Sequence, residues 1–135
     1  MIGVVLITHG QLGQQLVDTV TGMLGGLSLA TEVVAVHRHD DPDERAEQAA
    51  AAMARLGDCS ELLLLTDAFG STPSNIANRL AGPGRRVVAG VNLPMLVRIY
   101  NYPDLDLGRM VDSAVEAGRN GIMPCGETSG DNVRG

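Results

Sequence analysis

Lysine is absent from this chain of 135 residues, and all ten of its basic side chains are arginines. A Walker-type phosphate loop, a Schiff-base cofactor site and a receiver-type phospho-aspartate site each need a lysine, as a phosphate-binding charge or as an amine nucleophile. The sequence therefore excludes these three kinds of chemistry.

Positive charge is scarce, and long apolar runs are missing. The formal net charge is −6, and the one pair of adjacent basic residues is Arg85-Arg86, so neither a nucleic-acid footprint nor a polybasic membrane patch is present. The apolar runs at 3–7 and 62–65 are far too short to span a bilayer, and no basic segment of a secretory signal follows Met1. We expect a cytoplasmic protein without membrane insertion.

Metal-ligand spacing is also lacking. Cys59 and Cys125 lie far apart in the sequence and predict two reduced thiols rather than a disulfide. His37 and His39 precede two aspartates, but the pattern H-x-H-D-D matches no firm ligand set, which favours a solvated loop and no metal site.

What is present predicts one α/β domain. An apolar fraction of 44% suffices for one core in a chain of this length. Apolar strand patterns at 2–8, 31–36, 61–66 and 86–91 alternate with helical patterns at 12–24, 43–56, 71–80 and 92–100, and Asp104 or Asp106 opens a last helix. This alternation predicts a doubly wound open sheet with parallel strands in the order 2-1-3-4 and helices on both faces. The domain is expected over 1–123, with an edge segment and flexible tail over 124–135.

Two chemistry-bearing residues follow the strands that flank the switch point of this sheet. His9 closes the first strand and Asp67 closes the third, so both point into the crevice at the carboxyl edge. A carboxylate that accepts one ring N–H leaves the other nitrogen free as a nucleophile toward phosphorus. A lone histidine after a strand is more often a surface or capping residue, and it is the pairing with Asp67 that predicts a catalytic site.

Two further segments end on the same edge. The hydroxyls of Ser71 and Thr72, with the free N–H groups of a helix start, could receive phosphate oxygens, although Ser-Thr-Pro is also an ordinary helix cap. Exposed Leu93, Pro94 and Met95 would suit the docking of a partner. The competing interpretation, in which this segment belongs to the core, has equal weight.

Three motifs in register resemble the IIA domain of the mannose-type (mannose/fructose/sorbose) bacterial phosphotransferase system (PTS). They are I-T-H-G at 7–10, T-D-A-F-G-S-T-P-S-N at 66–75 and G-V-N-L-P-M-L at 90–96, and the similarity extends to about residue 122. The chain ends at Gly135 without a linker to a IIB domain, so it resembles the stand-alone form, some members of which serve regulation rather than uptake.

The resemblance implies that His9 is the phosphorylated histidine, on the ring nitrogen remote from Asp67. It implies a phosphoryl group received from the phosphocarrier protein HPr and passed to a IIB partner, without a cofactor or bound Mg²⁺. It also implies a homodimer and a C-terminal antiparallel edge strand, for which residues 121–126 are the only candidate.

Other functions remain open at this stage. A IIA-like subunit that feeds a dihydroxyacetone kinase uses an equivalent strand-end histidine, and a regulatory binding module could be switched by histidine phosphorylation. A mutase or phosphatase fits less well, because such enzymes usually place an arginine beside the nucleophile and the sequence shows none near His9.

Overall fold

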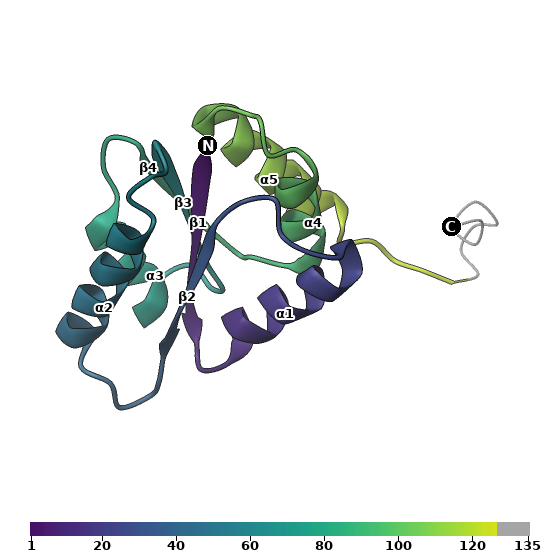
Figure 1. Ribbon diagram of the computed structural model, residues 1–135. Coiled ribbons are helices and arrows are strands. Elements are labelled where there is room, and N and C mark those ends of the chain that lie inside the picture. The colour runs from purple at the N-terminus through teal and green to yellow at the C-terminus, as the bar shows by residue number, and fades with distance from the viewer. Residues whose placement is uncertain (127–135) are drawn as a thin grey trace.

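The computed structural model describes residues 1–126, which form an open parallel sheet covered by helices on both faces (Figure 1). The strands are β1 (Ile2–His9), β2 (Thr31–Val36), β3 (Glu61–Thr66) and β4 (Arg85–Ala89). All neighbouring pairs are parallel and the order is β2-β1-β3-β4. The predicted fold class and strand order are confirmed.

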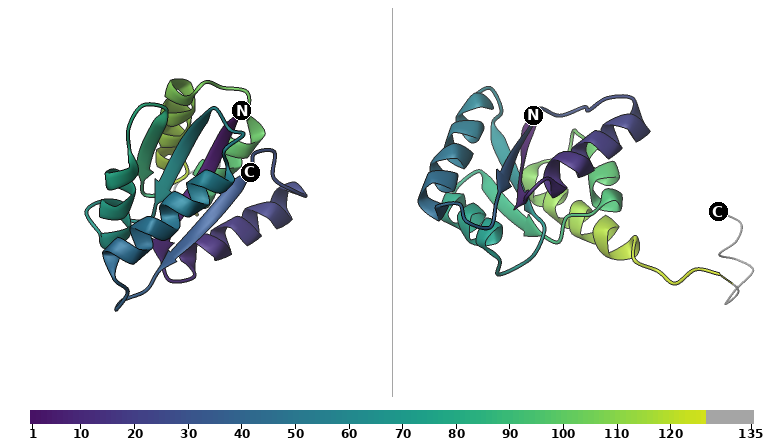
Figure 2. Two further views of the ribbon diagram at one scale, coloured as in Figure 1. Left: turned by 60° about the vertical axis from the view of Figure 1, so that its left-hand side comes forward. Right: turned by 90° about the horizontal axis from the view of Figure 1, so that it is seen from below.

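Two helical layers enclose the sheet. Helices α1 (Leu12–Leu24), α4 (Leu93–Asn101) and α5 (Leu107–Asn120) cover one face, and α2 (Pro42–Arg55) and α3 (Thr72–Leu80) cover the other. The three-layer arrangement is visible in Figure 1 and in the view from below in Figure 2. Among residues 1–126 no helix combines the length and the apolar character that crossing a membrane requires.

The central strand β1 is buried on both faces, which explains its unbroken apolar sequence. Val4 and Leu6 pack into the core beneath α1, α4 and α5, whereas Val5 and Ile7 pack against α2 and α3. All four side chains are fully buried. Because successive side chains of a strand point to opposite faces, packing on both faces fixes the position of β1 between the two helical layers. Its last residue lies at the carboxyl edge of the sheet.

Side-chain caps set the starts of four helices. Asp41, Ser71, Asn92 and Asp106 each accept a backbone N–H from the first turn of α2, α3, α4 and α5 respectively. Such caps satisfy N–H groups that have no partner within the helix. The last helix therefore begins after Asp106 rather than Asp104, which settles the alternative that the sequence left open.

The C-terminal edge strand implied by the resemblance does not form within the described residues. Residues 122–126 follow α5 without strand pairing. The reason is local, because Pro124 has no N–H to donate to a ladder and Gly126 has a φ of 104°. Residues 127–135, the rest of the predicted tail, lie outside the described part of the chain. Cys59 and Cys125 are both free thiols.

Candidate active site

His9 and Asp67 meet at the carboxyl edge of the sheet. His9 is the last residue of β1 and pairs with Val36 of β2, while Ile7 pairs with Thr66 of β3. Asp67 is thus the first residue beyond β3, opposite the end of β1. The backbone N–H of His9 donates to the Asp67 carboxylate at 3.1 Å. The Asp67 side chain thus accepts an N–H that would bond to a backbone carbonyl if the ladder between β1 and β3 continued.

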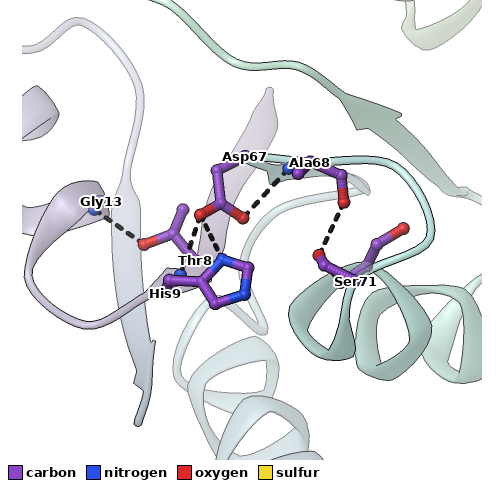
Figure 3. A network of polar contacts seen from close by, with 7 residues as sticks. Thr8, His9, Gly13, Asp67, Ala68 and Ser71 are labelled. Carbon is purple, nitrogen blue, oxygen red and sulfur yellow. Dashed lines mark hydrogen bonds and ion pairs between the residues drawn. The ribbon is translucent and has the colours of Figure 1, made fainter. Parts of the chain in front are cut away.

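The two side chains form a short hydrogen bond (Figure 3). Nδ1 of His9 lies 2.6 Å from Oδ2 of Asp67. The other carboxylate oxygen accepts the backbone N–H of Ala68 at 3.1 Å. With a carboxylate at Nδ1, the proton of a neutral imidazole resides on that nitrogen and Nε2 keeps its lone pair. The His9 side chain is 55% exposed, so this geometry offers Nε2 as an accessible nucleophile or base.

The electrostatics of Asp67 favour its charged form. The Asp67 side chain is only 10% exposed, and burial by itself would raise the pKa of this carboxyl. Hydrogen bonds from the ring and from the backbone N–H of His9 outweigh burial and hold the pKa of Asp67 below its usual 3.8. The ring therefore faces a carboxylate at neutral pH, and that negative charge stabilises any positive charge that develops on the imidazole.

A buried hydroxyl, which the sequence interpretation did not single out, shapes the turn that follows His9. Thr8 is fully buried, and its Oγ1 accepts the backbone N–H of Gly13 in α1 at 2.7 Å (Figure 3). A Cβ at position 13 would lie 2.7 Å from that oxygen and 3.3 Å from a methyl group of Val33. Helix α1 can approach β1 this closely because residue 13 is glycine. A threonine at a strand end, followed by a glycine in the next helix, is the signal that could have indicated the contact.

The two predicted phosphate-binding residues occupy different positions. The hydroxyl of Ser71 donates to the carbonyl of Ala68 at 2.6 Å and accepts the N–H of Ser74 at 3.5 Å, so its proton is bound to the loop and its oxygen caps α3. Thr72 instead lines a cavity of about 570 Å³ together with His9. Between the two, the structure favours Thr72 as the hydroxyl available to a ligand.

The same cavity contains an arginine, which corrects the expectation that none lies near His9. Arg38 lines the cavity with His9, and so do His37 and Asp40. These residues come from the turn after β2, 28 or more positions away in the sequence. The pairing of His9 with Val36 places the residues that follow position 36 beside the histidine. Knowledge of this strand pairing would have predicted that Arg38, His37 and Asp40 lie beside His9.

The predicted docking segment is only partly accessible. Met95 is 3% exposed and belongs to the core beneath α4 and α5, so the expectation that it is exposed was wrong. Leu93 is half-buried and Pro94 is exposed, and both line a groove of about 430 Å³, which shares no lining residue with the cavity of His9. Phe69, two residues after Asp67, is 89% exposed and is the more accessible apolar side chain beside the site.

Metal ligation finds no support in the described residues. Within 1–126, no three His, Cys, Asp or Glu side chains gather closely enough to hold a metal ion. His37 and His39 instead belong to a short turn, in which Asp40 accepts the N–H of residue 37 at 2.7 Å.

Comparison with known proteins gives consistent results. The family model described as "PTS system fructose IIA component" matches residues 3–115. The "PTS system mannose-specific EIIAB component" of Escherichia coli K12 is 34% identical over 129 residues, which cover 90% of this chain. This chain spans only 38% of the length of that relative. The corresponding protein of Shigella flexneri matches equally well.

Two solved structures share the fold. The mannose/sorbose-specific IIA subunit from Enterococcus faecalis has a TM-score of 0.84 at 24% identity, covering 94% of this chain and 96% of that one. Component EIIA from Streptococcus agalactiae has a TM-score of 0.79 at 21% identity, covering 92% of this chain and 97% of that one. At these identities the likeness concerns the architecture alone.

Proposed function

The chain belongs to the mannose-type IIA components of the bacterial phosphotransferase system, and from this premise we propose that it is a phosphohistidine carrier with His9 as the phosphorylated residue. It accepts a phosphoryl group from phospho-HPr and passes it to a IIB partner. The observation that carries the proposal is the 2.6 Å contact between Nδ1 of His9 and Asp67, which leaves Nε2 free on an exposed ring.

In this mechanism Nε2 of His9 attacks the phosphorus of the phosphohistidine on the donor. The new bond joins phosphorus to Nε2, and the bond to the ring nitrogen of the donor breaks, its electron pair returning to that ring. His9 becomes positively charged as the bond forms, while its Nδ1–H stays bonded to the Asp67 carboxylate. Little covalent work is asked of the protein, so the rate depends on in-line positioning and on stabilisation of charge.

The surface next to His9 supports docking of a donor protein. Phe69 exposes its ring beside Asp67, and aromatic side chains are enriched in the buried centres of protein interfaces. Thr72, which lines the cavity of His9, offers a hydroxyl to the phosphoryl oxygens. We include the donor contact of Phe69 and the phosphate contact of Thr72 in the proposal, and we assign Ser71 to shaping the loop between them.

The test is phosphorylation by phosphoenolpyruvate, enzyme I and HPr, followed by mapping of the acid-labile phosphate. His9→Ala should abolish labelling while the circular dichroism spectrum stays unchanged. His39→Ala is the matched control and should be labelled like the wild type, because residue 39 does not line the cavity of His9. In the same assay Phe69→Ala should raise the KM for phospho-HPr. Full labelling of the His9 variant would contradict the assignment.

The acceptor distinguishes the roles open to such a carrier. Transfer of the label to a IIB protein supports a place in sugar uptake, whereas transfer to nucleotide bound on a dihydroxyacetone kinase subunit supports the alternative carrier role. If the protein is a regulatory module, His9→Glu should change which proteins it binds without any transfer.

The proposal also includes a homodimer. The β4 strand lies at one edge of the sheet that residues 1–126 form, and an open strand edge is a surface on which another copy can add a strand. Sedimentation equilibrium of the full chain measures the mass directly. A monomer at all concentrations would remove the dimer from the proposal and would leave the phosphorylation site untouched.

A further inference from the structure

The turn after β2 is anchored beside His9. The carbonyl of Val36 accepts the N–H of Gly10 at 2.8 Å. The turn itself is closed in both directions, because Asp40 N–H donates to the carbonyl of His37 at 3.0 Å and the Asp40 carboxylate accepts the N–H of His37 at 2.7 Å. Residues 38 and 39 occupy the two central positions, so the backbone that carries Arg38 is held in place relative to His9.

Arg38 has no partner within the part of the chain that the structure describes. Several other arginines pair with a carboxylate there: Arg45, Arg55, Arg79, Arg98 and Arg109. Within the described residues 1–126, Arg38 makes neither an ion pair nor a side-chain hydrogen bond, although its side chain lines the cavity of His9. Its guanidinium is therefore available to an anion that enters this cavity.

We propose that Arg38 binds the phosphoryl oxygens of the group held on Nε2 of His9, an inference that rests on the proposed function. A phosphoryl group carries close to two negative charges, and here it enters a site beside the carboxylate of Asp67 and that of Asp40, which lies 3.8 Å from Arg45. Without a further cation this crowding of negative charge opposes phosphorylation. A guanidinium matches phosphate oxygens with two parallel N–H donors.

Such a contact exists only while His9 is phosphorylated, so it stabilises the phosphorylated state relative to the free one. The group that forms it is exposed, and screening by solvent and salt limits its strength. We expect Arg38→Gln to lower the equilibrium constant for transfer from phospho-HPr to His9 by about threefold to tenfold, which corresponds to about 0.7–1.4 kcal/mol.

The experiment equilibrates the full chain with a fixed ratio of phospho-HPr to HPr and measures the fraction of protein phosphorylated on His9. Arg38→Gln should reduce that fraction, and Arg38→Lys should restore part of it. The matched control is Arg86→Gln, which removes the same charge from an exposed residue near the start of β4, at the opposite edge of the sheet. The control should behave as the wild type does.

The dependence on salt concentration distinguishes an electrostatic role of Arg38 from a structural one. The difference between wild type and Arg38→Gln should shrink as ionic strength rises, whereas a purely structural role of residue 38 would leave it unchanged. Equal phosphorylated fractions in the two proteins, or a change confined to the KM for phospho-HPr, would overturn the role of Arg38. Failure of the wild type itself to accept phosphate on His9 would instead overturn the proposed function.

Discussion

Replacement of Asp67 by asparagine isolates the contribution of its charge. Three N–H groups point at the two carboxylate oxygens, from the ring and backbone of His9 and from the backbone of Ala68. Asparagine offers one oxygen and one NH₂ group. If its oxygen remains toward His9, the NH₂ faces the N–H of Ala68, and this N–H of an exposed residue loses its acceptor in the protein.

The magnitudes follow from these contacts. A hydrogen bond to a charged group contributes about 1.5–3 kcal/mol and a neutral one about 0.5–1.5 kcal/mol. Asparagine replaces the charged bond by a neutral one, so the loss is the difference between these ranges, about 1–1.5 kcal/mol. Because the ring of His9 is 55% exposed, we take the low end of this difference, about 1 kcal/mol, for the cationic ring formed during transfer. Asp67→Asn should therefore slow phosphoryl transfer about fivefold. Because water can replace the acceptor of the exposed Ala68 N–H, the loss of this bond should lower the free energy of unfolding by about 0.5–1.5 kcal/mol.

Rapid-quench measurement of transfer from phospho-HPr gives the rate, and chemical denaturation gives the stability. Asp112→Asn is the control, since it removes one exposed carboxylate from α5 and should change neither quantity appreciably. An Asp67→Asn protein that transfers phosphate within twofold of the control would refute the idea that this carboxylate supports the reacting ring.

The acid range supplies a second check on the same variant. The folded-state pKa of Asp67 lies below 3.8, mainly because bonds from His9 offset its burial. A depressed pKa contributes stability that is present above 3.8 and is lost as the pH falls through the folded-state value. The difference in unfolding free energy between wild type and Asp67→Asn should thus shrink below pH 3.8. A difference that stays constant there would contradict the charged state assigned to Asp67.

Three further substitutions test the packing of the fold around the sheet. Gly13→Ala should lower the free energy of unfolding by about 1–3 kcal/mol, because its methyl group meets the hydroxyl of Thr8. The control Gly22→Ala lies in the same helix, meets nothing within 4 Å and should stabilise the protein by up to about 1 kcal/mol. Equal shifts of the melting temperature in the two variants would contradict the close contact at Gly13. Burial raises the pKa of Tyr100 to about 12, against the lowering effect of its bond to Thr31. As the pH rises from 10.0 towards 12, wild type should therefore lose about 2–3 kcal/mol that Tyr100→Phe does not lose, as measured by urea titration at each pH.

The strand order and the central pair of residues could be predicted because they depend on local patterns. Each strand is a short apolar run, and every helix start of the described residues except that of α1 has a capping side chain. Both signals are contained in a few neighbouring positions. Where the sequence pattern was ambiguous, the predicted ends of an element differ from those in the structure. The fourth strand was predicted over 86–91 but ends at Ala89, because Gly90 has a φ of 89° and the N–H groups of residues 90 and 91 both bond to Thr66.

Features that depend on tertiary register could not be predicted from such patterns. The position of Arg38 beside His9 follows from which residue of β2 pairs with the end of β1, and a shift of one residue would carry it elsewhere. Burial of Met95 likewise depends on α5, whose Gly118 lets the two helices approach so closely that an added Cβ would lie 3.0 Å from the methionine methyl group. Neither the position of Arg38 nor the burial of Met95 can be predicted from the residues next to it in the sequence.

The ladder between β1 and β3 also determines when the reactive ring becomes oriented during synthesis of the chain. Histidine and carboxylate are 58 positions apart, and the bond between them joins the ends of two strands that α1, β2 and α2 separate in the sequence. A nascent chain on the ribosome has the histidine early, yet it cannot have a steered imidazole until the third strand has emerged and joined the first. A reaction that requires the ring of His9 in this orientation can therefore occur only after β1 and β3 have paired.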